Sequence, residues 1–263
     1  MTISIIGAGN MGSALCQSLL NKKICSAKNI TISDKNEVKL KQLKSKLKVK
    51  TSTDNANVLD CDFLFLAIKP QSFLELAEEI SGKIPKITTV ISIMAGAKLD
   101  KIAELLLHEK LVRAMPNTPA LVNEGVTGWV ANNNISPEEK TEIQKILEST
   151  GYAIELENED QIDKLTAISG CGPGFFFYIF DQWDKASQKL KLPDNKNKEI
   201  LIKTLKGSLA LLESSEDSAY TLTQKVASKG GATEQGLQVL ADSRFEEIMS
   251  KMIDAAYNRC KEL

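Results

Sequence analysis

A glycine-rich hexapeptide near the N-terminus constrains the fold more than any other feature. Gly7-Ala8-Gly9-Asn10-Met11-Gly12 follows the apolar run Thr2–Ile6 and opens a helical pattern, Met11–Asn21. A strand, a glycine turn and a helix in this order begin a dinucleotide-binding βαβ unit. The first glycine makes the tight turn, the second lets the backbone approach a pyrophosphate, and the third lets helix and strand pack closely. We therefore predict a nicotinamide coenzyme here, with a glycine turn that binds no ligand as the alternative.

The next 150 residues alternate in the way that a doubly wound sheet requires. The continuous apolar run Phe63–Ile68 is typical of a strand covered by helices on both faces. Ser136-Pro137-Glu138-Glu139 has the residue types of a helix start. Residues 1–157 are predicted to form a Rossmann-type α/β domain. Strands are expected at Thr2–Ile6, Ile30–Ser33, Val49–Thr51, Phe63–Ile68, Thr88–Ile93, Leu111–Arg113, Val126–Ala131 and Tyr152–Leu156, and helices at Met11–Asn21, Asn36–Lys46, Ser72–Ser81, Leu99–Leu107 and Pro137–Ser149.

The pattern changes to helix only after about residue 158. Leu201, Leu205, Leu209 and Leu212 recur at helical spacing, and no alternating strand pattern follows. Residues 158–263 are predicted to form an all-α domain. Its aromatic stretch Phe175–Phe180 is apolar on every side, which is typical of a helix in a domain core or dimer core. We therefore expect a homodimer or a higher homo-oligomer of dimers.

The chain has one histidine, His108, among its 263 residues. A metal site with several imidazoles is therefore excluded, and no metal is expected. A Ser-His-Asp hydrolase would have to use this one histidine, so we expect the chemistry to come mostly from a bound cofactor. His108 itself is expected on a helix surface. The 33 basic and 34 acidic side chains give a net charge of -1, which argues against nucleic acid as a partner.

Cysteine usage and hydropathy indicate the compartment. Five cysteines, an odd number with no CxxC spacing, favour reduced thiols in a cytoplasmic protein. No run approaches eighteen apolar residues, so no membrane span is expected. The first residues resemble a strand and not a signal peptide.

Two segments at predicted strand ends carry candidate coenzyme ligands. Asp34 stands where an acid binds the ribose hydroxyls of NAD and repels a 2′-phosphate. The neighbouring Ser33 and Lys35 leave the choice between NADH and NADPH open, and a plain turn is an alternative for this segment. Ala67-Ile68-Lys69-Pro70 ends the buried strand, where Lys69 can meet a phosphate or a carboxylate or can simply face solvent.

A third glycine segment, Gly230-Gly231-Ala232-Thr233, precedes a helical pattern in the second half. Two glycines before a helix offer a group of N–H donors to a carboxylate. Thr233 is suited either to cap this helix or to donate a hydrogen bond to a ligand.

Together these segments resemble the pyrroline-5-carboxylate reductase family, the last enzymes of proline synthesis, over nearly the whole chain. Four departures stand out: Cys171, Gly174 and Phe175 replace Ser, Ala and Tyr of the family, and Lys229 replaces a proline before the glycine pair. The motifs that carry the resemblance are Gly7–Gly12, Ala67–Pro70, Ile91–Gly96, Arg113–Pro119, Ser169–Gly174 and Val226–Thr233.

The resemblance implies a Rossmann domain followed by an interlocking helical dimerisation domain. It places substrate near Glu159, Val226, Gly230, Gly231, Ala232 and Thr233. The predicted coenzyme contacts are Gly7, Ala8, Gly9, Asn10, Met11, Gly12, Ser33, Asp34, Asn55, Ala67, Ile68, Lys69, Pro70, Ala95 and Asn117.

The scarcity of histidine fits this reaction. Reduction of a ketone usually needs an acid for the new alkoxide, whereas a protonated imine is already electrophilic and yields a neutral amine. We expect reduction of 1-pyrroline-5-carboxylate to proline, with Thr233 as donor at nitrogen and Lys69 as an electrostatic helper.

Two alternatives stay open at this point. One is another reductase of cyclic imines or β-hydroxy acids. The acids would need a catalytic lysine, and Lys203, Lys206 and Lys225 are present. The other is an inactive nucleotide-binding regulator, which only Lys229 encourages.

Overall fold

The computed structural model describes residues 1–193 and 196–262, so residues 194, 195 and 263 of the predicted second domain lie outside the described residues. The chain divides into two compact units. Unit 1 comprises residues 1–173 and 256–263, and unit 2 comprises residues 174–255. Each unit is described by itself below. The predicted division at 157/158 marks the change from mixed to helical structure, and as a domain boundary it stays a prediction.

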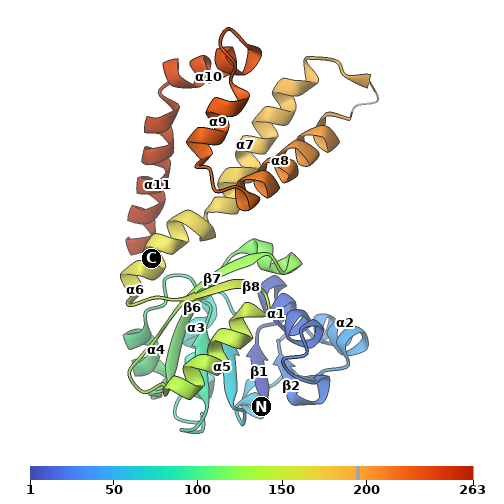
Figure 1. The fold of residues 1–263 in the computed structure, drawn as a ribbon. Coiled ribbons are helices and arrows are strands. Elements are labelled where there is room, and N and C mark those ends of the chain that lie inside the picture. The colour runs from blue at the N-terminus through green and yellow to red at the C-terminus, as the bar shows by residue number, and fades with distance from the viewer. Residues whose placement is uncertain (194–195, 263) are drawn as a thin grey trace. The chain divides into compact units, whose positions relative to one another are not determined.

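Unit 1 is built on one eight-stranded sheet, so the predicted α/β class is confirmed (Figure 1). The strand order is β3-β2-β1-β4-β5-β6-β7-β8. All neighbouring strands are parallel except β6 and β7, so β7 and β8 run against the other six. The strands are β1 (Ile3–Ile6), β2 (Ile30–Ser33), β3 (Lys50–Ser52), β4 (Phe63–Leu66), β5 (Thr89–Ser92), β6 (Leu111–Pro116), β7 (Gly125–Ala131) and β8 (Gly151–Glu155).

Helices cover both faces of this sheet, as the apolar strands require. Phe63 and Phe65 of β4 pack in one apolar core, whereas Leu64 and Leu66 pack in the other. This alternation places a core on each side of the sheet. The first core includes side chains of α1 (Asn10–Asn21), α2 (Glu37–Leu47) and α5 (Pro137–Glu148), and the second includes those of α3 (Phe73–Ile80), α4 (Leu99–Leu106) and α6 (Glu159–Leu165).

Local sequence signals set several element ends. Ser136 Oγ accepts from Glu139 N at 3.2 Å, and Ser136 N donates to Glu139 Oε2 at 2.9 Å, so the predicted start of α5 is confirmed. The expected strand Phe63–Ile68 ends two residues early, because Ala67–Lys69 turn away to form a loop. β6 runs three residues beyond its expected end because β7 pairs with it antiparallel as far as Pro116 and Thr127.

After β8 the described residues form helices and the loops that join them, with no strand among these residues, which confirms the all-α prediction. None of the described helices is both long and apolar enough to cross a lipid bilayer. A π-helical turn, Thr166–Gly170, follows α6 and leads into α7. The remaining helices are α7 (Gly172–Gln188), α8 (Asn197–Ser214), α9 (Ala219–Val226), α10 (Ala232–Asp242) and α11 (Phe245–Glu262).

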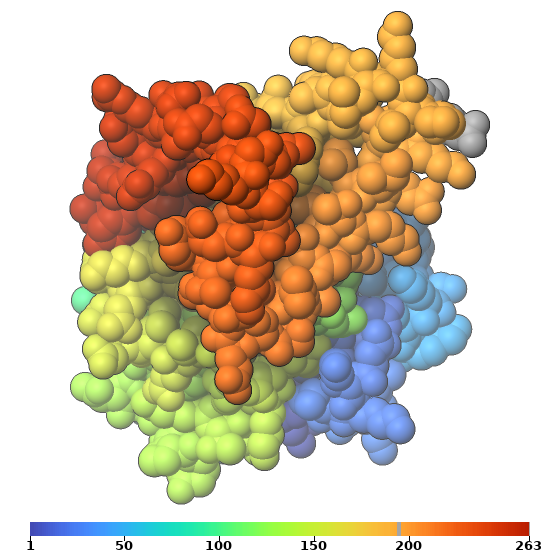
Figure 2. Space-filling model, turned by 45° about the horizontal axis from the view of Figure 1, so that its top comes forward, coloured from blue at the N-terminus to red at the C-terminus, as the bar shows by residue number. Residues whose placement is uncertain are grey.

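Unit 2 is coloured orange to red in Figure 2. It exposes many large apolar side chains in the single chain. The α7 aromatics, expected in a domain core or a dimer core, are open in the single chain: Phe177 is 61% exposed and Tyr178 69%. A groove of about 540 Å³ between α7 and α8 is lined by Phe176, Phe180 and Leu209, among others. A surface this apolar is typical of a face that binds another protein chain.

The position of His108 differs from the expectation of a surface residue. The side chain follows α4 and is only 5% exposed. Its Nε2 donates to Thr88 O at 2.8 Å, which fixes the neutral ring with the proton on Nε2. Burial lowers the pKa of His108 below its usual value near 6.5. This histidine therefore has a structural role between α4 and β5.

The burial of His108 predicts a loss of stability in acid. Because the folded pKa is depressed, the unfolded state takes up the proton first as pH falls below about 6.5. The free energy of unfolding should therefore fall from pH 7 to pH 5 more steeply in the wild type than in H108Q, whose amide can still donate to Thr88. Urea titrations across this pH range measure the free energy of unfolding of both proteins. Equal slopes of this free energy against pH would contradict the prediction.

Candidate active site

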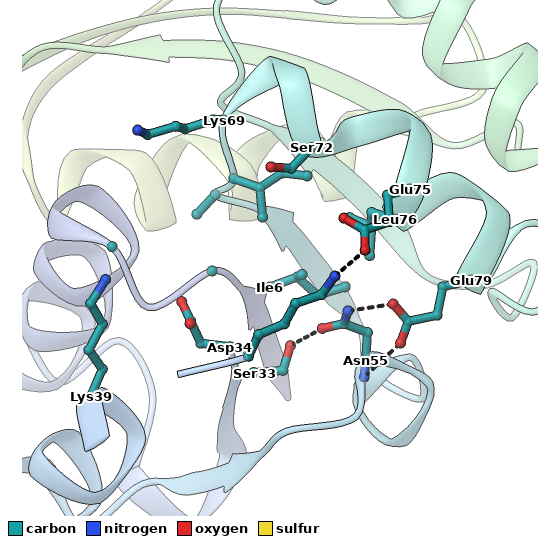
Figure 3. Close-up of a pocket in the computed structure, with 15 residues that line it drawn as sticks. Ile6, Ser33, Asp34, Lys39, Asn55, Lys69, Ser72, Glu75, Leu76 and Glu79 are labelled. Atoms are coloured by element: carbon teal, nitrogen blue, oxygen red, sulfur yellow. Dashed lines mark hydrogen bonds and ion pairs between the residues drawn. The ribbon is translucent and has the colours of Figure 1, made fainter. Parts of the chain in front are cut away.

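A pocket of about 300 Å³ lies at the carboxyl ends of β1, β2 and β4 (Figure 3). The strand order reverses here, since β1 pairs with β2 on one side and with β4 on the other. Open α/β sheets bind ligands at such a switch point. The pocket is lined by Ile6, Gly7, Gly9, Ser33, Asp34, Lys35, Lys39, Asn55, Ala67, Ile68, Lys69, Ser72, Glu75, Leu76 and Glu79.

The three glycines of the hexapeptide meet different demands. Gly7 has φ +110°, and a Cβ there would lie 2.3 Å from Ala67 O. A Cβ on Gly12 would lie 2.1 Å from Gly7 O. A Cβ on Gly9, in contrast, would meet none of the described atoms within 4 Å. Gly7 and Gly12 thus serve the fold, while the bare backbone of Gly9 faces open space in the pocket wall. This arrangement fits a coenzyme diphosphate at the start of α1.

A buried polar chain forms the floor of the pocket. Ser33 Oγ donates to Asn55 Oδ1 at 2.8 Å. Asn55 Nδ2 donates to Glu79 Oε2 at 2.9 Å, and Asn55 N donates to Glu79 Oε1 at 3.3 Å. The structure therefore brings together Ser33 and Asn55, two predicted coenzyme contacts.

Asp34 bridges the glycine loop and the residues after β2. Its Oδ2 accepts from Ala8 N at 2.8 Å, and its Oδ1 accepts from Asn36 N at 2.8 Å. The second bond forms the turn that was one interpretation of this segment. The first bond places the carboxylate beside the hexapeptide, on the pocket wall, where a ligand of the ribose hydroxyls has to lie. Asp34 can therefore form the turn and also bind the ribose.

Three lysines and three carboxylates line the pocket: Lys35, Lys39, Lys69, Asp34, Glu75 and Glu79. Lys35 Nζ lies 2.5 Å from Glu75 Oε1, and both side chains are about two-thirds exposed. This hydrogen bond raises the pKa of Lys35. Lys69 and Asn55 lie at opposite sides of the pocket in Figure 3.

Sequence reasoning missed the acidic side of the pocket. Glu75 and Glu79 lie one helical turn apart on α3 and both face the pocket. The signal was available, because this helix follows the Lys69-Pro70 loop almost directly and carries acids at i and i+4.

Seven predicted coenzyme contacts do not line this pocket: Ala8, Asn10, Met11, Gly12, Pro70, Ala95 and Asn117. Ala8 and Asn10 line the adjoining hollow instead. Ala95 lies in the loop between β5 and α4. Asn117 is 7% exposed and has both ends of its amide engaged. It donates to Ser169 O at 2.9 Å and accepts from Val126 N at 2.9 Å, so in this structure its side chain serves the fold.

Glu159, a predicted substrate contact, belongs to an ion cluster at the start of α6. Its Oε1 accepts from Arg113 at 3.0 Å and from Leu99 N at 3.1 Å. Arg113 also donates to Asp163 Oδ1 at 2.8 Å. Its side chain is 4% exposed, whereas that of Glu159 is 27% exposed. Glu159 therefore balances a buried arginine, and its role toward substrate stays a prediction.

The remaining predicted substrate residues lie in unit 2. Gly231 is the N-cap of α10, with no side-chain cap, and Thr233 is the second residue of the helix and is exposed. The interpretation of Thr233 as a cap is therefore wrong, because its hydroxyl lies two residues too late in the chain. Gly230 N donates to Glu234 Oε2 at 2.6 Å, so a carboxylate already meets one amide of the predicted donor group.

Comparison with known proteins extends over the whole chain. A family model described as pyrroline-5-carboxylate reductase dimerisation matches residues 159–263, and one described as NADP oxidoreductase, coenzyme F420-dependent, matches residues 2–96. A pyrroline-5-carboxylate reductase of Staphylococcus aureus is 37% identical, with 100% of this chain and 98% of the relative covered. The chain belongs to the pyrroline-5-carboxylate reductase family.

Solved structures of the family have the same fold. A pyrroline-5-carboxylate reductase from Coxiella burnetii has a TM-score of 0.88 at 33% identity, covering 99% of this chain and 97% of the other. The Plasmodium falciparum enzyme, solved with NADP bound, has a TM-score of 0.88 at 27% identity and covers 100% of this chain and 97% of the other. The resemblance inferred from the motifs is confirmed.

Proposed function

We propose that this chain reduces 1-pyrroline-5-carboxylate to L-proline with NADH or NADPH. The observation that carries the proposal is the bare backbone of Gly9, which faces the switch-point pocket in a member of this reductase family. The reduced nicotinamide, when bound, supplies the hydride. Gly7–Gly12 and the start of α1 offer backbone N–H groups to its diphosphate, and the Ser33–Asn55 pair borders its other end.

The protein has little chemistry to supply beyond binding and orientation. The backbone N–H groups of the Gly230–Thr233 segment are proposed to bind the substrate carboxylate, with Val226 and Glu159 as further substrate contacts. Gly230 N and Gly231 N would then exchange their present bonds to Glu234 Oε2 and Ser228 O. Thr233 Oγ1 is proposed to hold a hydrogen bond at the ring nitrogen, and Lys69 to add positive potential. The new amine is neutral after a protonated imine is reduced, so no histidine is needed.

The apolar surface of unit 2 supports a homo-oligomer in which this unit is the contact between subunits. The match of residues 159–263 to a dimerisation model agrees with that assignment. We propose a homodimer, or a higher assembly of dimers, located in the cytoplasm, with a cyclic imino acid as substrate and neither nucleic acid nor membrane as a partner.

The activity is tested on purified protein with 1-pyrroline-5-carboxylate and each reduced coenzyme. Loss of the near-ultraviolet absorbance of the coenzyme, with formation of proline, is the expected result. A panel of other cyclic imines and β-hydroxy acids, the latter with oxidised coenzyme, separates the alternative reductases. Tight coenzyme binding without turnover on any substrate would favour a regulator.

Thr233→Ala tests the proposed donor. Loss of one hydrogen bond at the reacting nitrogen is expected to lower kcat by about tenfold. Since Thr233 is exposed and does not cap α10, the Tm should stay within a few degrees. Thr233→Ser, which keeps the hydroxyl, is the matched control and should retain most of kcat. A large fall in Tm with unchanged kcat would assign the threonine to the fold alone.

A further inference from the structure

We propose that this chain prefers NADH to NADPH, and that Asp34 and Glu75 set the preference. The proposal depends on the proposed function only in taking the switch-point pocket as the coenzyme site. The two coenzymes differ by one phosphate on the adenosine ribose. The residues that discriminate between them are therefore those at the end of β2, next to the glycine loop.

Asp34 is held in a position that disfavours a phosphate. Its two carboxylate oxygens accept from Ala8 N and from Asn36 N, each at 2.8 Å. One of these amides belongs to the coenzyme loop, so the carboxylate cannot rotate away without breaking a bond to that loop. A ribose hydroxyl can donate to the lone pairs of Asp34 that remain free, whereas a 2′-phosphate has only acceptor oxygens and a like charge.

Lys35 is the nearest cation in sequence that could compensate, and Glu75 restrains it. The Lys35 ammonium lies 2.5 Å from Oε1 of Glu75 on α3. A 2′-phosphate would have to draw Lys35 out of this pair. The pair is exposed, so its effect is modest compared with that of Asp34. Glu75 is thus a positioning residue, which acts on the coenzyme through Lys35.

The other charges around the pocket do not reverse this preference. Lys39 also lines the adjoining hollow beside Ala8, Gly9 and Asn10, so its charge serves the diphosphate that both coenzymes carry. Glu79 adds a further carboxylate, bound to Asn55. The described lining therefore places three carboxylates and three lysines around one small pocket. Of these lysines, Lys35 is the one next to Asp34 in the chain, and a carboxylate already engages it.

The test compares kcat/KM for NADH and NADPH in the wild type, D34N, E75Q and E78Q. Asn at position 34 keeps an acceptor for Ala8 N but removes the charge. Glu78 is exposed on the same helix as Glu75 and does not line the pocket, so E78Q is the matched control for charge. Dissociation constants of both coenzymes, measured by calorimetry without substrate, give a readout that needs no turnover.

We expect the wild type to favour NADH by about tenfold or more, and D34N to lower this ratio by about tenfold, through the loss of like-charge repulsion. E75Q should lower the ratio by about threefold through a smaller KM for NADPH, and E78Q should leave it unchanged. A wild type that prefers NADPH, or a D34N ratio within twofold of the wild type, overturns the proposal. If no variant turns over but the dissociation constants follow these ratios, the proposed function fails and this inference stands.

Discussion

Replacing Arg113 by Met is expected to lower the free energy of unfolding by about 3 kcal/mol or more. The side chain is 4% exposed and lies between Glu159 Oε1 and Asp163 Oδ1. Asp163 is itself only 11% exposed at its side chain. Met has a similar length and is apolar, so the dominant loss is the charge that balances two partly buried carboxylates. Because Glu159 also accepts from Leu99 N, the cluster ties α6 to β6 and to the start of α4.

A surface pair on the same unit gives the control. Lys140 Nζ lies 2.6 Å from Glu155 Oε1, and the two side chains are 38% and 42% exposed. K140M should cost less than about 1 kcal/mol, because exposed ion pairs contribute little. Urea unfolding at a fixed protein concentration compares the two variants, since an oligomer is stabilised by its own concentration. If R113M costs no more than K140M, the cluster does not stabilise unit 1 as we infer.

The parts of the fold that follow local rules were predictable from sequence. The hexapeptide lies at its strand-to-helix turn, and Phe63–Leu66 is buried on both faces as its apolar run indicated. These features depend on residues within one or two turns of chain. The direction of β7 was missed, because this strand is buried on both faces and lacks the alternating pattern that is common in antiparallel strands.

Contacts between distant residues account for most of what sequence reasoning missed. Lys35 meets Glu75 forty residues away, and Arg113 meets Asp163 fifty residues away. We expected His108 at the surface because charged neighbours flank it. Its ring is instead buried, with a hydrogen bond to Thr88 O, twenty residues earlier. Burial of a polar side chain depends on a partner, and nothing local in the sequence identifies that partner.

The same limit applies to Thr233 in unit 2. Its residue type suits an N-cap, but a helix begins where the preceding backbone allows, and here that residue is Gly231. Gly230, with φ +74°, lets the chain turn directly before the helix, so α10 starts two residues before the threonine. The Thr233 hydroxyl therefore has no capping role, so a change of kcat in Thr233→Ala cannot result from the loss of a helix cap.

Gly9→Ala is expected to weaken binding of either coenzyme by about a hundredfold while the fold is kept. Gly9 has φ -71° and ψ -175°, a conformation open to alanine. The added Cβ would meet no described atom within 4 Å, so the apoprotein should keep its Tm. Its methyl group would instead occupy the space through which the diphosphate approaches the backbone. Calorimetric titration with NADH and NADPH measures the loss, which should be equal for the two because both carry the same diphosphate.

Gly12→Ala is expected to destabilise the fold, in contrast to Gly9→Ala. Its Cβ would lie 2.1 Å from Gly7 O, a backbone atom that cannot move without displacing the β1–α1 turn. We expect a loss of about 2 kcal/mol or more in the free energy of unfolding. One added methyl group thus separates the two functions of the hexapeptide, binding at Gly9 and packing at Gly12. If Gly9→Ala lowers Tm as much as Gly12→Ala, or leaves both dissociation constants unchanged, the bare backbone of Gly9 is not the coenzyme contact that we propose.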